Sequence, residues 1–245
     1  MHRGGGFTMA GMLLLAIGGG VRDASAQTDR YPRMAPIGEY LMNEDAEVRL
    51  ARSAAPPAVS NDATILVLRR QGYDTAAVGR NGFVCMVARS WMAAFDWAEF
   101  WNPKVRAADC MNRQAARTLV PLVLLRSRLV MAGRSREEIL AATQEAVAKG
   151  QVPTLEGGAM HYMMARSSYL GDDGDHNAAH LMFLTQGIEA ADWGSNMEGS
   201  PVMSAPYWFF GATTPAQTQG LPPFHVFLVG VSTWSDGTPV AKHDD

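Results

Sequence analysis

The first half of the sequence contains three short apolar runs separated by turn residues. Thr64–Leu68, Tyr73–Val78 and Phe83–Ala88 are rich in branched and aromatic side chains and have the length of β-strands. The Asn81-Gly82 dipeptide before the third run is typical of a tight hairpin, so the runs predict an N-terminal meander. Both faces of the third run are apolar, which predicts a central position in the sheet.

Helical periodicity appears before and after this predicted meander. Residues 36–52 have apolar positions near helical spacing, with Pro36 as the first residue. Asn112 is a cap for a helix over residues 113–131, which Pro121 is expected to kink or split. The Ser135-Arg136-Glu137-Glu138 run is a capping box for a helix that ends at Lys149-Gly150. Residues 158–166 predict one more short helix.

The last third of the chain predicts two strands around a long irregular segment. His180–Leu184 and Phe224–Val231 are apolar runs of strand length, while residues 185–221 are rich in Gly, Pro, Ser and Thr. Aromatic side chains in residues 90–103 are expected to form a packing layer over the sheet. Strands thus precede and follow a block of helices. This order predicts a single α+β domain over residues 36–240, with a mostly antiparallel sheet covered by helices.

The N-terminus has the composition of an export signal. A short basic start precedes an apolar stretch, and Ala24-Ser25-Ala26 is typical of a signal-peptidase site. We therefore predict a signal peptide at residues 1–26, a loose lead-in at 27–35 and a disordered tail at 241–245, with the mature protein periplasmic or secreted. Retention of the leader as an N-terminal anchor is the alternative. No later apolar run is long enough to span a bilayer.

Charge and cysteine usage fit an exported protein. The net charge is −3, and removal of Arg3, Arg22 and Asp23 with the leader would leave −4, which gives no reason to expect nucleic acid as a partner. Cys85 and Cys110 are the chain's two cysteines, and in an oxidising compartment they predict one disulfide bond. A reactive thiol at Cys85, with His161 or His180 as its base, is the competing hypothesis.

A metal site is one candidate for chemistry. His176 and His180 stand four residues apart, and three carboxylates precede them: Asp172, Asp173 and Asp175. Imidazoles with a carboxylate bind zinc, and carboxylates in a Gly-containing loop bind calcium. The spacing matches no complete metal-binding motif, and the competing interpretation is a solvated acidic turn.

A ligand-binding surface is the other candidate. His161 and four aromatic residues in or beside the irregular segments could contact a small molecule or an envelope component: Trp193, Tyr207, Trp208 and Trp234. Core packing of the same aromatics is the alternative, and solvent exposure distinguishes the two. No nucleotide-binding loop or serine-nucleophile motif is present.

Several short stretches of the mature chain resemble an uncharacterised family of exported bacterial proteins. They are residues 81–85 (NGFVC), 100–104 (FWNPK), 158–160 (GAM), 180–183 (HLMF), 193–196 (WGSN) and 234–238 (WSDGT). The resemblance implies one integral exported domain and no particular activity. The sequence therefore favours a non-catalytic binding or structural module without a cofactor. A metal-dependent hydrolase that uses His176, His180 and the aspartates is the alternative.

Overall fold

The structure is a computed structural model, and it describes residues 30–172 and 178–241. The predicted signal peptide, the first residues of the lead-in and the tail after Ala241 lie outside the described residues. Within the described ranges, no helix combines the length and the apolar character needed to cross a bilayer.

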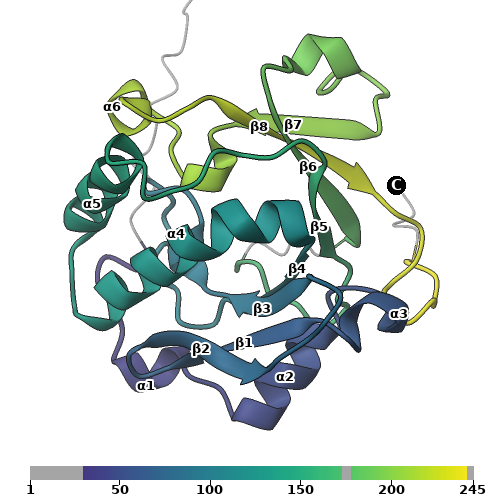
Figure 1. The fold of residues 1–245 in the computed structure, drawn as a ribbon, viewed down its shortest axis with the longest axis horizontal. Coiled ribbons are helices and arrows are strands. Elements are labelled where there is room, and N and C mark those ends of the chain that lie inside the picture. Colours follow the sequence, from purple (N-terminus) through teal and green to yellow (C-terminus); the bar gives the residue numbers. More distant parts are fainter. Residues whose placement is uncertain (1–29, 173–177, 242–245) are drawn as a thin grey trace, which may run out of the picture.

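One open sheet of eight strands organises the described residues (Figure 1). Its strand order is β2-β1-β3-β4-β5-β6-β8-β7. The strands are β1 (Thr64–Arg69), β2 (Gly72–Ala77), β3 (Val84–Ala88), β4 (Ala107–Met111), β5 (Ala159–Met163), β6 (His180–Gln186), β7 (Val202–Pro206) and β8 (Phe224–Gly230). Every neighbouring pair is antiparallel except β1 and β3, which run parallel. The predicted α+β class with a mostly antiparallel sheet is confirmed.

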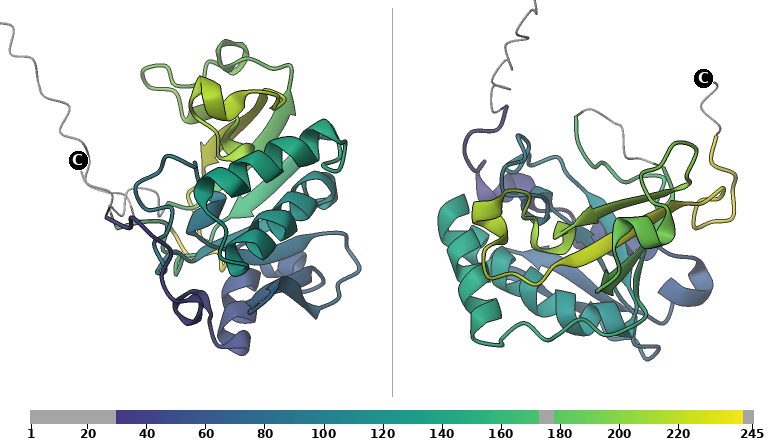
Figure 2. Two further views of the ribbon diagram at one scale, coloured as in Figure 1. Left: turned by 90° about the vertical axis from the view of Figure 1, so that its left-hand side faces the viewer. Right: turned by 90° about the horizontal axis from the view of Figure 1, so that it is seen from above.

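Helices pack on both faces of this sheet (Figures 1 and 2). The helices are α1 (Ile37–Tyr40), α2 (Glu44–Arg52), α3 (Pro57–Ser60), α4 (Arg113–Met131), α5 (Arg136–Ala148) and α6 (Pro215–Thr218), with 3-10 turns η1 (Ser90–Met92), η2 (Ala190–Trp193) and η3 (Trp208–Phe210). The larger core lies on the α4 side and includes Met86, Met111 and Leu122. The smaller core lies on the α2 side and includes Ile65, Cys85 and Cys110.

The predicted meander is wrong in its second connection. β1 and β2 form a hairpin, but β3 then returns beside β1 in parallel orientation. The Asn81 side chain explains the difference. Its Nδ2 donates to the Val59 carbonyl at 2.7 Å, and its Oδ1 accepts from the Phe83 amide at 3.0 Å. Asn81-Gly82 therefore ties the chain to α3 before β3 begins, instead of folding β3 back onto β2.

Two helix predictions also need correction. Residues 158–166 do not form a helix, because residues 159–163 are strand β5, paired with both β4 and β6. The predicted helix over 36–52 is two helices, because Leu41 is extended and the Asn43 side chain caps α2 by accepting from the Ala46 amide. The sequence prediction also missed β4 and β7, which are five-residue strands.

The other helix and strand signals are confirmed. Asn112 caps α4, and Ser135 and Glu138 form both bonds of the capping box of α5. The expected split at Pro121 is wrong, because α4 is a single helix that continues through this residue. β3 is central and β6 begins at His180, as predicted. The aromatic layer is core, since four of its five large rings are buried: Trp91, Phe95, Phe100 and Trp101.

A buried arginine joins α4 to this aromatic layer. Arg126 is fully buried, its guanidinium lies 4.4 Å from the centre of the Phe95 ring, and it donates to the carbonyls of Phe210 and Ala93. Burial lowers the pKa of Arg126 to about 9. The Phe210 carbonyl is at the end of η3, and the Ala93 carbonyl comes directly after η1. Arg126 therefore joins α4 to both turns by donating hydrogen bonds to these two backbone carbonyls.

Candidate functional site

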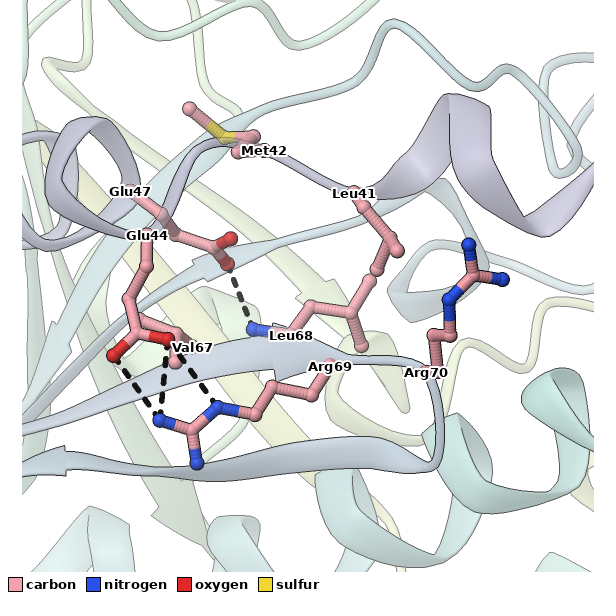
Figure 3. Close-up of a pocket in the computed structure, with 8 residues that line it drawn as sticks. All are labelled: Leu41, Met42, Glu44, Glu47, Val67, Leu68, Arg69 and Arg70. Carbon is pink, nitrogen blue, oxygen red and sulfur yellow. Dashed lines mark hydrogen bonds and ion pairs between the residues drawn. The ribbon is translucent and has the colours of Figure 1, made fainter.

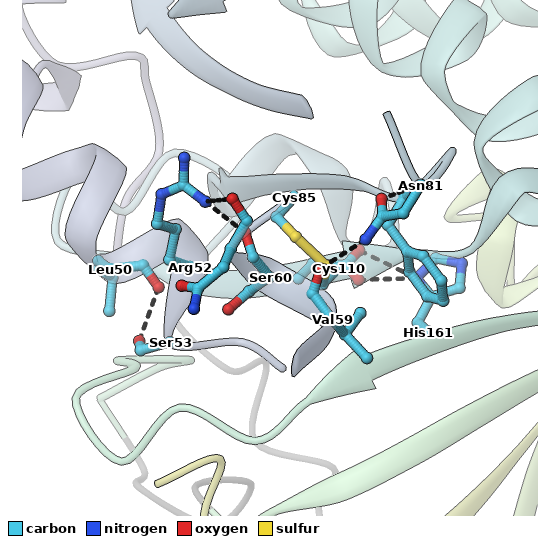
Figure 4. The surroundings of a disulfide bond; sticks show 12 residues. Leu50, Arg52, Ser53, Val59, Ser60, Asn81, Cys85, Cys110 and His161 are labelled. Carbon is cyan, nitrogen blue, oxygen red and sulfur yellow. Dashed lines mark hydrogen bonds and ion pairs between the residues drawn. A yellow bond between two sulfur atoms is a disulfide. The ribbon is translucent and has the colours of Figure 1, made fainter. Parts of the chain in front are cut away.

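The disulfide predicted from the sequence is present. Cys85 and Cys110 stand directly opposite each other on β3 and β4, are bonded, and have Cα atoms 3.9 Å apart (Figure 4). Both residues are fully buried in the core on the α2 side. The thiol hypothesis for Cys85 is therefore wrong, because a bonded cysteine offers no thiolate.

Asp172 belongs to a dense polar cluster rather than to an open ligand set. Its carboxylate accepts from the hydroxyls of Tyr169 and Tyr31, from Arg30 at 2.8 Å and from Lys104 at 3.4 Å. The hydrogen bond from Tyr169 and then that from Arg30 hold the pKa of Asp172 well below its usual range. Both oxygens of Asp172 thus accept hydrogen bonds from four donors, which come from three separate places in the chain.

Glu99 also belongs to the polar cluster around Asp172. It is buried, it accepts the Asp172 amide at 3.0 Å and the Asn102 side-chain amide at 2.7 Å, and Asn102 in turn accepts the Lys104 amide. Asn102 and Lys104 lie between η1 and β4. These contacts give residues 99–104 a structural role, because they hold Asp172 in place.

The proposed metal ligands are only partly described. Asp173, Asp175 and His176 lie outside the described residues. His180 begins β6, and its Nδ1 lies 2.9 Å from the Ala178 carbonyl, so that nitrogen carries the proton in this contact. In the described ranges, no three His, Cys, Asp or Glu side chains gather at distances suited to a metal ion. The described members of the set, Asp172 and His180, are held by protein groups.

His161 is the most unusual of the predicted site residues. It lies on β5, is 5% exposed, and its Nδ1 is 2.9 Å and 3.0 Å from the two carboxylate oxygens of Asp109 on β4. Its Nε2 is buried and has no hydrogen-bond partner among the described residues. The sequence analysis did not identify Asp109, because it stands 52 positions from His161 and only the β4–β5 pairing brings them together.

The four predicted aromatic residues divide by exposure. Trp193 is 42% exposed and Trp208 is 47% exposed. Tyr207 is half-buried and packs against the core on the α4 side. Trp234 is half-buried, with the Arg166 guanidinium 5.8 Å above its ring. Trp193 and Trp208 therefore meet the exposure criterion for a binding surface, whereas Tyr207 and Trp234 have structural contacts.

Large exposed apolar side chains concentrate near edge strand β7. Five such side chains occur in the described ranges, and four of them belong to residues 193–208: Trp193, Met197, Met203 and Trp208. We call these four residues the β7 rim. Trp193 packs its inner face on Phe227, with ring centres 4.3 Å apart, and leaves the rest of its indole in solvent.

The backbone of β7 is itself protected by Asn196. The side-chain amide of Asn196 accepts from the Ser204 amide and donates to the Ser204 carbonyl, each at 2.9 Å. Its own backbone amide donates to the Val202 carbonyl. Asn196 thus occupies positions that a further strand would use, which limits edge-to-edge pairing. The stretch 193–196 therefore closes the sheet edge and presents Trp193 beside it.

The segment that carries the β7 rim contains acidic residues and no basic ones. No Lys or Arg occurs between Ser167 and Ala241, whereas seven residues of this segment are Asp or Glu. Three of these acidic residues are exposed between β6 and β7: Glu189, Asp192 and Glu198. Within this segment, the charged residues next to the exposed apolar side chains of the rim are therefore all acidic.

A small pocket lies elsewhere, between α2 and the β1–β2 hairpin (Figure 3). Its volume is about 230 Å³. Glu44 pairs with Arg69 at 3.1 Å across it, and the buried Glu47 bonds both Arg89 and the Leu68 amide. Three of the four charged residues that line this pocket, Glu44, Glu47 and Arg69, are committed to one another or to buried partners, so it is a weaker candidate for ligand binding than the β7 rim.

Comparisons with protein-family models, with curated proteins and with solved structures found no match for this chain.

Proposed function

We propose that this protein is an exported, non-catalytic binding module whose contact surface is the β7 rim. The observation that carries the proposal is the clustering of exposed Trp and Met side chains in residues 193–208. Trp and Met are enriched where proteins bind partners, because both bury a large apolar area and Met adapts to irregular surfaces. Exposed side chains of this kind along one edge of the sheet mark a candidate interaction surface, with Trp193 on the Phe227 face and Met203 on the Leu228 face of that edge.

The charge of the rim favours a particular class of partner. Glu189, Asp192 and Glu198 border the exposed apolar groups, and no basic residue in this segment offsets them. Complementary charge speeds encounter and selects against partners of the same sign. The partner of the rim is therefore a cationic amphipathic segment, with an apolar face for Trp193 and Met197 and basic groups for the surrounding carboxylates.

The disulfide and the N-terminal sequence are both compatible with an exported protein. The buried Cys85–Cys110 disulfide is compatible with an oxidising compartment, and the sequence of residues 1–26 has the features of a signal peptide. We place the mature protein in the periplasm or outside the cell. The candidate partners are then segments of exported or envelope proteins.

Calorimetric titration tests the proposal with a synthetic peptide of leucine and lysine that forms an amphipathic helix. We expect binding that weakens with salt, and no binding of the matched peptide with glutamate in place of lysine. The double variant Trp193→Ser/Trp208→Ser should weaken binding at least about tenfold, which corresponds to about 1.4 kcal/mol.

Two further arms decide where and how the peptide binds. Val78→Ser removes the one large exposed apolar side chain outside the rim in residues 30–172 and 178–241, so it should leave the affinity unchanged. Glu198→Gln should weaken binding and reduce its salt dependence. Equal affinity for both peptides, equal affinity of the double variant and the wild type, or binding to anionic lipid vesicles with the same strength would each overturn the proposal.

A further inference from the structure

His161 lies in a setting of soft, neutral ligand atoms. In the sheet register it stands directly opposite Met111 of β4 on one side and Met182 of β6 on the other. Directly paired residues of an antiparallel ladder lie on the same face, with Cβ atoms about 4.5–5.5 Å apart. Met111 and Met182 are both buried in the core on the α4 side. One imidazole is thus flanked by two thioethers.

The hydrogen bonding of His161 leaves one ring nitrogen for a ligand. Asp109 holds Nδ1 through both carboxylate oxygens, so the proton of a neutral ring stays on Nδ1 and the lone pair stays on Nε2. A carboxylate on the far nitrogen is the usual support for a metal-bound histidine, because it fixes the tautomer and the orientation of the ring. Nε2 is buried and has no partner among the described residues, which is costly for a polar atom in a core.

We propose that His161 Nε2, Met111 Sδ and Met182 Sδ form a binding site for a soft monovalent metal ion of the Cu(I) class. Thioether and imidazole ligands select Cu(I), whereas Mg²⁺ and Ca²⁺ prefer oxygen ligands. The three ligands are neutral, and the Asp109 carboxylate balances the single charge of the ion. The Asp109 side chain is 14% exposed, so solvent reaches the edge of the site. This site is independent of the β7 rim.

Titration with Ag(I) tests the site without changing the oxidation state of the protein. Ag(I) shares the ligand preference of Cu(I) and needs no reductant, so the Cys85–Cys110 bond stays intact. We expect calorimetry of the mature protein to give one tight site, and His161→Gln to remove it. Asp109→Asn should weaken affinity about tenfold to a hundredfold, the range for loss of a supporting carboxylate.

Methionine variants keep the test interpretable if His161→Gln fails to fold. Met111→Leu and Met182→Leu conserve core volume, so circular dichroism should match the wild type while each variant weakens Ag(I) binding at least about tenfold. Met203→Leu is the matched control, because Met203 is exposed on β7 of the same sheet. No tight site in the wild type, unchanged affinity in both core variants, or an equal loss in Met203→Leu would overturn the proposal.

Discussion

At the scale of single residues, polar side chains that bond distant segments explain much of the structure. Asp172 joins residues 30, 31, 104 and 169, and Asn196 covers the backbone of the edge strand. These roles are not visible in local sequence, because each partner is set by the fold. Asp172 is predicted as a metal ligand from its position close to His176 and His180 in the sequence, whereas in the structure it accepts hydrogen bonds from Arg, Lys and Tyr side chains.

The pKa of Asp172 predicts a dependence of stability on acid. The carboxyl pKa is lower in the folded protein than in the unfolded chain, so its stabilisation is complete above about pH 4 and is lost as pH falls below that value. Asp172→Asn should destabilise the protein at pH 6, and the difference from the wild type should shrink toward pH 3. Urea unfolding at the two pH values measures this. A difference that does not change with pH would contradict the assignment.

The disulfide makes a second prediction at this scale. The double variant Cys85→Ala/Cys110→Ala should lower the free energy of unfolding by about 3 kcal/mol, because the bond closes a 25-residue loop in the unfolded chain. Urea unfolding of the non-reduced proteins gives the value. As a check on the bond itself, thiol labelling of the native wild type should find no free sulfhydryl. Stoichiometric labelling of Cys85 would refute it.

At the scale of elements, the close approach of two segments limits which substitutions the chain tolerates. Gly211 follows η3 with φ of 61°, and a Cβ there would lie 2.3 Å from the Ala93 carbonyl oxygen. Gly220 has φ of 76° and open space around it. Both Ala variants carry the strain of a left-handed backbone, about 1 kcal/mol, but Gly211→Ala should cost about 2 kcal/mol more through the clash. Equal thermal stability of the two variants would show that the segments are not in contact.

The elements differ in how far sequence alone predicts them. The capping box at Ser135 and the cap at Asn112 are local signals, and both were predicted correctly. β4, β5 and β7 have five residues each and gain their stability from neighbouring strands, so local pattern did not predict them. The role of Asp109 was not predicted for the same reason, because its pairing with His161 depends on the strand order. Of the aromatic candidates, only exposure in the folded protein separates Trp193 and Trp208 from Tyr207 and Trp234.

At the scale of the whole molecule, the fold places two different features on one half of the sheet. The β7 rim lies at the outer edge, whereas His161 lies on β5 in the interior of the sheet. The opposite half contains the disulfide and the buried Arg89–Glu47 ion pair, which fix β3 to β4 and α2 to β1. The β7 rim thus lies at the far edge from the disulfide, whereas the proposed metal site shares strand β4 with it through Met111 and Asp109.

Processing of the N-terminus is the prediction for the chain as a whole. Ala24-Ser25-Ala26 places small residues where a signal peptidase cleaves, so the exported protein should begin at Gln27. Intact-mass measurement of exported material determines the first residue. Material that keeps residues 1–26 would support the anchored alternative and contradict the release of a free exported domain.

The proposed contact surface of the whole molecule is the β7 rim. Photo-cross-linking with a leucine–lysine peptide that carries a photoreactive group tests it most directly, because mass spectrometry locates each cross-link on the chain. We expect cross-links concentrated in residues 189–208 and greatly reduced in the Trp193→Ser/Trp208→Ser variant. Cross-links that fall mainly on α5 or around the pocket beside α2, with residues 189–208 unmarked, would contradict it.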